Sequence, residues 1–598
     1  MQGPAASEQR ALARSTVQVP ATTRDIGGGL ERAQLWLVRL GAFLLPLVVL
    51  WSTNDPVVLP KLLAARALVL LLATLFVARW LRGGMKVLRT PLDLPILAYV
   101  ASAGVSTVLA ANRNLAFFGS YGRLEGFLTI ATYGLLFWLT VQSSSNPTAA
   151  RSVLRALLAG AFVVSLFAVL QAVAWALVAG PTSSLTRAAA TFGNSNALAA
   201  YLAMALPLAV NEYLRASSTS DRIMAGNVVV MVTIALVLTF GRGGWVGAVV
   251  GVMLVIAAGR ASRRRITVMA GAAAGLVAAI VLAVTLLGAG GVPIAQATAT
   301  RLVSLLDPAA GTGAIRLHIW KDTLAMIASR PLVGYGPDNF GLVFPTFQTG
   351  SWSRLSIIDE SHSELLQIAA TQGVIGLAAF VWLCIAFMRL WWKGRHRAMA
   401  SGVIGACVGY LMTILVNFSV VPAALPFWLF LAAGAVILQG DPASQARTQA
   451  PQRRRYPPLA AGLLAVAALS VAAIAFPYVA DTRLHDSLAA FTAGDRERAK
   501  GFLVDARTLQ PQQQMYAAEV GNESMAAADW AAARDGYTTA ANLGSFDPSV
   551  FRQLAIADEH LGLHDQAIAA AKRSVELNRF DPRNLAVLHA LTPDAKTA

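Results

Sequence analysis

Long apolar runs separated by short polar links make up most of the first 480 residues of the chain. A helix needs about 20 mainly apolar residues to cross about 30 Å of hydrocarbon, and runs long enough to do so recur throughout this part. They predict thirteen membrane-spanning helices, at residues 34–52, 61–80, 92–110, 124–142, 154–179, 196–214, 223–240, 243–259, 266–289, 364–390, 398–418, 424–440 and 457–478. The pattern therefore predicts an all-α, polytopic membrane helix bundle.

After the last run the pattern becomes alanine-rich, charged and amphipathic, with a period of 34 residues. Alanines at this spacing follow small turn residues by five positions, and prolines lie at the ends of the units. The alanines are Ala499, Ala533 and Ala567, the turn residues are Gly494, Ala528 and Gly562, and the prolines are Pro511, Pro548 and Pro582. The period resembles that of tetratricopeptide repeats and predicts an α-solenoid of about three repeats. Such repeats bind or position a partner, or they act only as a packing cap.

These patterns divide the chain into five predicted regions. The membrane domain is expected to hold twelve helices and one large outer loop at residues 290–363. The regions are a disordered cytoplasmic tail (1–33), the membrane domain (34–440), a basic cytoplasmic linker (441–456), a thirteenth membrane helix (457–478) and the repeat domain (479–598).

Composition and charge support a membrane protein. Hydrophobic residues make up 56% of the chain and charged residues 13%, which is too apolar for a soluble domain of this size. Basic residues cluster near 79–89, 260–265, 393–397 and 453–455. Thirteen crossings with a cytoplasmic N-terminus place all four clusters on the cytoplasmic side, where short loops are rich in Lys and Arg. The net charge of +17 thus indicates topology and contact with anionic lipids, and no nucleic-acid motif accompanies it. A cytoplasmic N-terminus places the repeats outside the cytoplasm.

Histidine is the best candidate for a general base at the outer face. Of seven histidines, the topology leaves only His318 and His362 on that face of the membrane domain. His362 lies in Glu360-Ser-His-Ser-Glu-Leu-Leu-Gln367, at the foot of a long apolar run. A titratable side chain where a membrane helix emerges is a functional candidate. Interfacial or capping roles are the alternative, and they fit His318 better.

Several arginines and a lysine share this face. Arg242 lies in the tight turn Phe240-Gly-Arg-Gly-Gly244, which holds it at the membrane boundary, and a constrained guanidinium suits a phosphate or carboxylate. A lipid-headgroup anchor is the alternative. Further cations are Arg123, Arg316, Arg330 and Lys61. Together they predict an anion-binding outer vestibule.

No motif for a metal, cofactor or nucleotide accompanies these residues. Paired cysteines are absent, the outer face of the membrane domain has no closely spaced histidines, and no Walker loop occurs. The two cysteines, Cys384 and Cys407, fall inside predicted membrane helices and are read as packing residues. The chemistry is therefore expected to use a preactivated substrate without a cofactor.

Four motifs in order resemble the bacterial O-antigen ligase and polymerase superfamily across most of residues 35–440. They are Thr191-Phe-Gly-Asn-Ser-Asn-Ala-Leu-Ala199, the turn at Arg242, Arg316-Leu-His-Ile-Trp320 with Arg330-Pro-Leu-Val-Gly-Tyr-Gly-Pro337, and His362-Ser-Glu-Leu-Leu. The resemblance implies a twelve-helix inner-membrane glycosyltransferase. It would move a glycan from undecaprenyl diphosphate to an acceptor without metal or nucleotide. Arg242 and Arg316 would match the functional arginines, and His362 the essential histidine.

The residues leave the acceptor open. A thirteenth helix and a repeat domain depart from a plain lipopolysaccharide ligase, which puts a lipid A-core acceptor in doubt. A polysaccharide polymerase and a protein O-glycosyltransferase would use the same donor site. A different class, a non-enzymatic membrane scaffold or a glycan exporter with a protein partner on the repeats, is the remaining alternative. Few charges lie within the spans, which disfavours transport.

Overall fold

The chain is helical throughout the part that the computed structural model describes, and no strand occurs in that part. The described residues are 21–81, 87–178, 187–258, 267, 271, 312–350, 357–440 and 457–593. This confirms the predicted all-α fold. The helices, with two 3-10 turns labelled η, are α2 (Ala21–Leu44), α3 (Val58–Leu81), α4 (Asp93–Val108), α5 (Arg113–Phe118), α6 (Phe127–Ser143), α7 (Pro147–Val178), η1 (Ala190–Phe192), α8 (Ser195–Arg215), α9 (Thr219–Leu238), α10 (Arg242–Ala258), α13 (Thr312–Ser329), α14 (Phe340–Val343), η2 (Phe344–Thr346), α15 (Glu364–Gly394), α16 (Ala400–Leu415), α17 (Val421–Gln439), α18 (Pro457–Thr492), α19 (Arg496–Leu509), α20 (Gln514–Ala526), α21 (Trp530–Asn542), α22 (Pro548–His560), α23 (His564–Leu577) and α24 (Pro582–Leu591).

Six of the helices are long and apolar enough to cross a membrane: α3, α7, α8, α9, α15 and α17. Four shorter apolar helices, α4, α6, α10 and α16, match further predicted spans. Apart from residues 267 and 271, the span at 266–289 lies outside the described residues, as does the linker at 441–456, so the number thirteen stays a prediction.

Two predicted regions differ from the structure. α2 begins at Ala21, so a helix replaces the predicted disorder from that residue onward, because the polar segment continues directly into the apolar run. Residues 1–20 lie outside the described part. The predicted loop 290–363 contains α13, α14 and η2, since each is too short or too polar to read as a span.

The centre of the bundle is formed by α8 and α17, whose apolar stretches are 89% and 94% buried. α10 packs against α16 and α8 through glycines. A Cβ at Gly247 would lie 2.3 Å from the carbonyl oxygen of Gly409, and one at Gly251 would lie 2.5 Å from that of Gly405. Small residues thus let these two backbones touch, as in many membrane helix pairs. The contact fixes where α10 begins, and therefore where Arg242 lies.

The C-terminal helices pack as consecutive pairs, α20 with α21 and α22 with α23, consistent with the predicted solenoid. The alanines of the 34-residue period, Ala499, Ala533 and Ala567, are fully buried. The preceding turn residues, Gly494, Ala528 and Gly562, have φ angles of 83°, 56° and 72°. The period therefore marks the closest helix contacts and the left-handed turns. The predicted boundary after residue 478 falls inside α18, which runs from Pro457 to Thr492.

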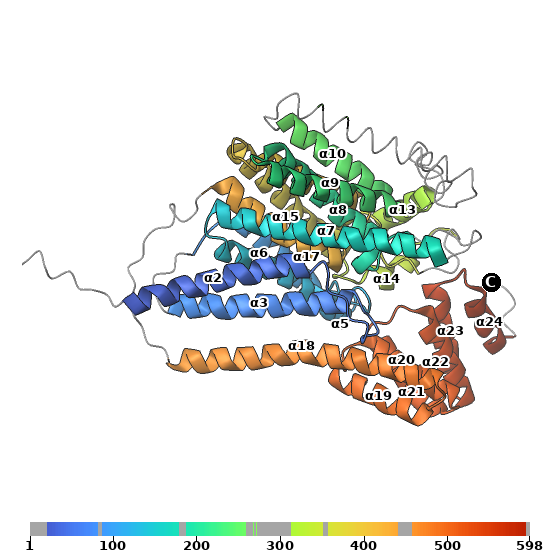
Figure 1. Cartoon of the computed structure of the whole chain (residues 1–598). Coiled ribbons are helices and arrows are strands. Elements are labelled where there is room, and N and C mark those ends of the chain that lie inside the picture. Colours follow the sequence, from blue (N-terminus) through green and yellow to red (C-terminus); the bar gives the residue numbers. More distant parts are fainter. Residues whose placement is uncertain are drawn as a thin grey trace, which may run out of the picture.

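The helices α19–α24 gather at the end of the bundle where α13 and α14 lie (Figure 1). We call this the loop end; it carries α5, α13, α14 and residues 119–126 and 357–363. The side-chain amide of Asn114 donates to the carbonyl oxygens of Gln512 (2.9 Å) and Leu543 (3.0 Å). Phe546 packs on Gly341, where a Cβ would lie 2.8 Å from the ring. The repeat domain is therefore docked on the membrane domain and not only linked to it by α18.

α15 is broken near its start by Gly373, which has φ 70° and ψ −171°. The segment 330–337 lies along the break and contacts the carbonyl groups that the break frees. The amide of Gly336, for example, donates to the carbonyl of Thr371 at 2.8 Å. The quoted Arg-Pro-Leu-Val-Gly-Tyr-Gly-Pro motif thus fills the break and sets the direction of the short first part of α15, which follows His362.

We expect Gly373→Ala to destabilise the protein strongly. Its φ alone costs a non-glycine residue about 1–3 kcal/mol, and the new Cβ would lie 2.2 Å from the carbonyl oxygen of Leu332. Gly226→Ala in α9 is the control, because its Cβ would meet only the Tyr213 ring at 3.6 Å. Thermal unfolding in detergent should show a lower Tm for the first variant and an unchanged or higher Tm for the second. Equal Tm values would contradict the assigned break.

Candidate functional site

His362 lies directly before α15, at the loop end. Its backbone is left-handed, with φ of 53°, a conformation that costs energy and tends to occur at functional positions. Its ring packs on Phe418, with centroids 5.3 Å apart, and no hydrogen bond joins its ring nitrogens to another described residue. Burial, followed by the positive charge of Arg316, lowers the pKa of His362 to about 4. The imidazole is therefore neutral at pH 7 and able to accept a proton.

Asn417, Phe418 and Ser419, which we call the junction segment, connect α16 to α17 and join the parts of the site. The side-chain oxygen of Asn417 accepts from Arg316 at 3.0 Å. The ring of Phe418 contacts both His362 and the guanidinium of Arg123, which lies 4.7 Å from the ring centroid. The amide of Ser419 donates to the Glu364 carboxylate at 2.8 Å. Sequence reasoning missed this segment; its signal is an amide and a hydroxyl in a short link between two apolar runs.

Arg242 and Arg316 face the same region from different elements. Arg242 is the first residue of α10, and the next residue, Gly243, lies so close to Asn417 that a Cβ there would be 2.9 Å from the amide nitrogen. Burial and then the positive charge of Arg242 lower the pKa of Arg316. Two guanidinium groups that repel each other in a partly buried place favour a bound anion, which would neutralise both.

Arg187 is a third arginine beside the Arg242 turn, and sequence reasoning missed it. It donates to the carbonyl oxygen of Thr239 (2.8 Å) and to the side-chain oxygen of Asn196 (2.7 Å). Asn196 belongs to the motif at 191–199, so the structure brings this motif to the turn of Arg242. The asparagines of the motif are the signal that could have indicated a partner for a buried cation.

Arg123 has a different role from the one predicted. It donates to Asp359 and to Glu360 at 2.7 Å each, so both partners are carboxylates of the segment that leads into His362. Burial would lower the pKa of Arg123, but the charges of Glu360 and Asp359 outweigh it and raise the pKa. Because its charge is already compensated, Arg123 holds the histidine segment in place and is not a free site for an anion.

The remaining predicted residues lie apart from this group. Lys61 is fully buried and donates to the carbonyl oxygens of Val48 and of Thr191, the latter at 2.7 Å, so it supports the motif at 191–199. Arg330 donates to the carbonyl of Leu109, at the end of α4. His318 is exposed on α13. The structure thus brings together His362, Arg316, Arg242 and Arg123 from the predicted set.

The repeat domain contacts the loop that carries Arg123. The hydroxyl of Tyr121 donates to the carboxylate of Asp481 in α18 at 2.6 Å, and the amide of Asp55 donates to the same carboxylate at 2.9 Å. From the other side, Ser120 donates its backbone amide to Asp338 at 2.6 Å. The loop 119–126 is therefore held between the repeat domain and the residues beside His362.

Comparisons with known proteins identify part of the chain. Residues 227–381 match the family model described as O-Antigen ligase, which confirms the resemblance for this stretch; it includes Arg242, Arg316 and His362. The match indicates a multi-pass inner-membrane protein of the glycan ligase or polymerase class. No curated protein matches. Among solved structures, the crystal structure of the APC/C hetero-tetramer Cut9-Hcn1 aligns over 77% of this chain and 90% of its own at 12% identity. Its TM-score of 0.19 is too low to inform the fold.

We expect Asp481→Asn to loosen the loop 119–126. The carboxylate accepts hydrogen bonds from both Tyr121 and Asp55, and hydrogen bonds to charged groups are among the stronger ones. Hydrogen exchange at the amides of Arg123 and Leu124, which bond to Ser120, should become about 10-fold faster. Asp505→Asn is the control, since that exposed carboxylate pairs only with Arg483 at 3.7 Å. Equal exchange in both variants would show that docking does not restrain the loop.

Proposed function

Because residues 227–381 carry an O-antigen ligase domain, we propose that the protein is a glycosyltransferase of the outer face of the bacterial inner membrane. It moves a glycan from an undecaprenyl-diphosphate-linked donor to an acceptor hydroxyl. One observation carries this proposal: a neutral imidazole at His362 and a pair of guanidinium groups at Arg242 and Arg316 meet at the junction segment.

The donor diphosphate binds Arg242 and Arg316 in this mechanism. The bond between the anomeric carbon and the diphosphate oxygen breaks as the acceptor oxygen attacks from the opposite face, so the configuration inverts. The two arginines stabilise the negative charge that grows on the leaving diphosphate. His362 takes the proton of the acceptor hydroxyl and becomes an imidazolium. Lipid diphosphate is a good leaving group, and the arginines supply the electrostatic role that a metal ion would otherwise have.

The acceptor defines the alternatives within this class. A second lipid-linked glycan would make the protein a polysaccharide polymerase, and a protein hydroxyl would make it a protein O-glycosyltransferase. A non-enzymatic scaffold or glycan exporter remains the alternative of another class. In our proposal the N-terminus is cytoplasmic and the repeat domain lies on the same side as His362, which its contacts at the loop end support. The repeats, similar to tetratricopeptide repeats, position an acceptor or a protein partner there.

We expect His362→Ala to abolish transfer in a reconstituted assay with a lipid-diphosphate-linked glycan. A general base contributes about 10² to 10⁴ in rate, whereas donor binding through the arginines should persist. His318→Ala is the matched control, because that side chain is exposed on α13. Retained turnover in His362→Ala would remove this residue from the mechanism. Absence of turnover in the wild type with every lipid-linked glycan would favour the scaffold or exporter.

We expect the pH profile of kcat/KM for the donor to stay flat from neutral pH down to about pH 5. The reason is that the base must be neutral and the pKa of His362 is lowered to about 4 in the free protein. Since the charge of Arg316 contributes to this lowering, Arg316→Gln should move the acid limb to higher pH, whatever its effect on the maximal rate. Arg330→Gln should leave the limb in place. A wild-type limb near pH 6.5 would contradict the assignment.

A further inference from the structure

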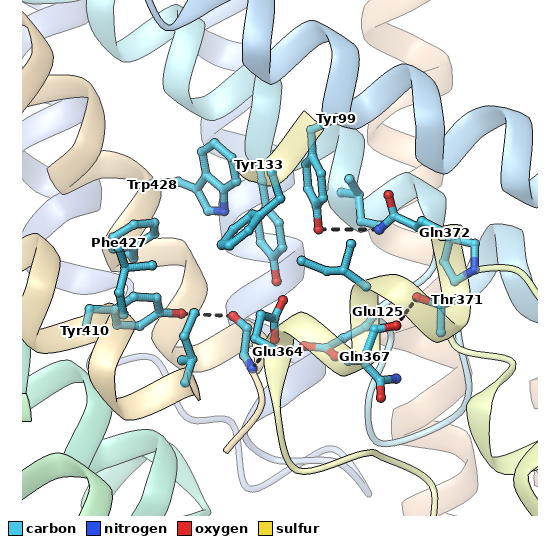
Figure 2. Close-up of a pocket in the computed structure, with 17 residues that line it drawn as sticks. Tyr99, Glu125, Tyr133, Glu364, Gln367, Thr371, Gln372, Tyr410, Phe427 and Trp428 are labelled. Carbon is cyan, nitrogen blue, oxygen red and sulfur yellow. Dashed lines mark hydrogen bonds between the residues drawn. The ribbon is translucent and has the colours of Figure 1, made fainter. Parts of the chain in front are cut away.

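Two adjoining cavities lie beside α15, α16 and α17, and Ser419 of the junction segment lines the first of them. The first, of about 100 Å³, has a polar lining that includes Glu125, Tyr133 and Glu364 (Figure 2). The second, of about 70 Å³, is lined by apolar and sulfur-containing side chains that include Leu383, Phe387 and Met388. The two cavities share Phe380, Leu411, Phe427 and Trp428 in their linings. They form one amphipathic site, with its polar part at the start of α15 and its apolar part further along that helix.

Polar groups without a hydrogen-bond partner among the described residues face the first cavity. The hydroxyl of Tyr133 is buried and makes no hydrogen bond within the described residues, although its ring is stacked on Trp428 at 6.0 Å. The carboxyl of Glu125 also makes no hydrogen bond to another described side chain or backbone group. In Figure 2, Tyr99, Tyr133 and Trp428 form one wall, and Glu125, Glu364 and Gln367 form the facing wall. Buried polar groups nearly always have partners, so these groups indicate a polar ligand.

The lining selects the chemistry of that ligand. Two carboxyl groups disfavour a phosphate or diphosphate, which separates this site from the arginine side. Carboxyl, amide and phenol groups next to aromatic rings suit the hydroxyl groups and apolar faces of a sugar ring. A cavity needs about 10–15 Å³ to hold one water, so the first cavity, of about 100 Å³, has room for several waters or one sugar ring. The apolar second cavity suits a hydrocarbon chain.

We infer that the two cavities bind a glycolipid with an uncharged sugar head. The sugar lies among Glu125, Tyr133 and Glu364, and the chain lies along α15 beside Phe387. This step rests on the proposed function, in which the glycolipid is the acceptor. Ser419 lines the cavity, and its neighbour Phe418 packs on His362, so the acceptor site lies next to the candidate base.

Binding of alkyl glycosides tests the site without any need for turnover. The protein in nanodiscs is titrated with octyl glycosides that carry glucose, galactose, N-acetylglucosamine or rhamnose, and with a sugar-free octyl polyoxyethylene, while its thermal unfolding is recorded. At least one glycoside should raise the Tm above the sugar-free compound. Tyr133→Phe should weaken that binding about 3- to 10-fold, as the loss of one hydrogen bond does. If no glycoside exceeds the sugar-free compound, or if phosphatidylglycerol competes equally, the inference is wrong.

The stability of the same variants separates binding from folding. Tyr133→Phe removes a buried hydroxyl that has no partner, so the Tm without ligand should be unchanged or higher. Ser165→Ala in α7 removes another such hydroxyl and should leave glycoside binding unchanged. Glu125→Gln, which keeps a polar group of the same shape with an acceptor oxygen, should bind like the wild type, whereas Glu125→Leu should not bind. Unchanged glycoside binding in both Tyr133→Phe and Glu125→Leu would overturn the proposed glycolipid site, even if the transferase activity is confirmed. Glycoside binding without any transfer activity would support the glycolipid site but reject the proposed reaction.

Discussion

The guanidinium of Arg123, whose side chain is only 16% exposed, holds the loop end together. A charge out of water must be paired, and Arg123 meets this need with the carboxylates of Asp359 and Glu360, both at 2.7 Å. Because these acids lie just before His362, the ion pairs fix the histidine. Because Tyr121, two residues before Arg123, bonds to Asp481, the same loop also binds the repeat domain. The position of the candidate base and the docking of the repeats therefore depend on one short loop.

The junction segment contacts both the candidate arginine pair and the acidic start of α15. Asn417 contacts Arg316, and Ser419 contacts Glu364. Both contacts are made by neutral groups of the junction segment, and Phe418, between these two residues in the sequence, packs on His362. On the proposed function, the donor diphosphate lies at the Asn417 end of this segment and the acceptor hydroxyl at the Ser419 end. This separation is what a transfer reaction between two substrates needs.

The repeat domain is part of the same arrangement. Its helices contact α5, α14 and the loop 119–126, and α18 continues unbroken from the predicted span into the first helix pair. A partner bound to the repeats would therefore be held at the end of the bundle that carries His362. Proximity of this kind raises the local concentration of a tethered group.

The sequence by itself determined the helical class, the approximate positions of most helices and the 34-residue period, because apolar runs and buried alanines are repeated local patterns. It also pointed to His362, Arg242 and Arg316, since a histidine or an arginine at a membrane boundary is unusual and the motif order is specific.

Only the tertiary structure decided how these residues act. Arg123 and Lys61 read as free cations in the sequence, but one is paired with two acids and the other with backbone carbonyls. The junction segment and the break at Gly373 carry no strong local signal, because they act through contacts with distant residues. Asn417 and Ser419 contact residues about one hundred and about fifty positions away. Gly373 contacts a residue about forty positions away. Pairing of buried charges and satisfaction of freed backbone groups are properties of the packed bundle, and no local pattern of apolar and polar residues specifies them.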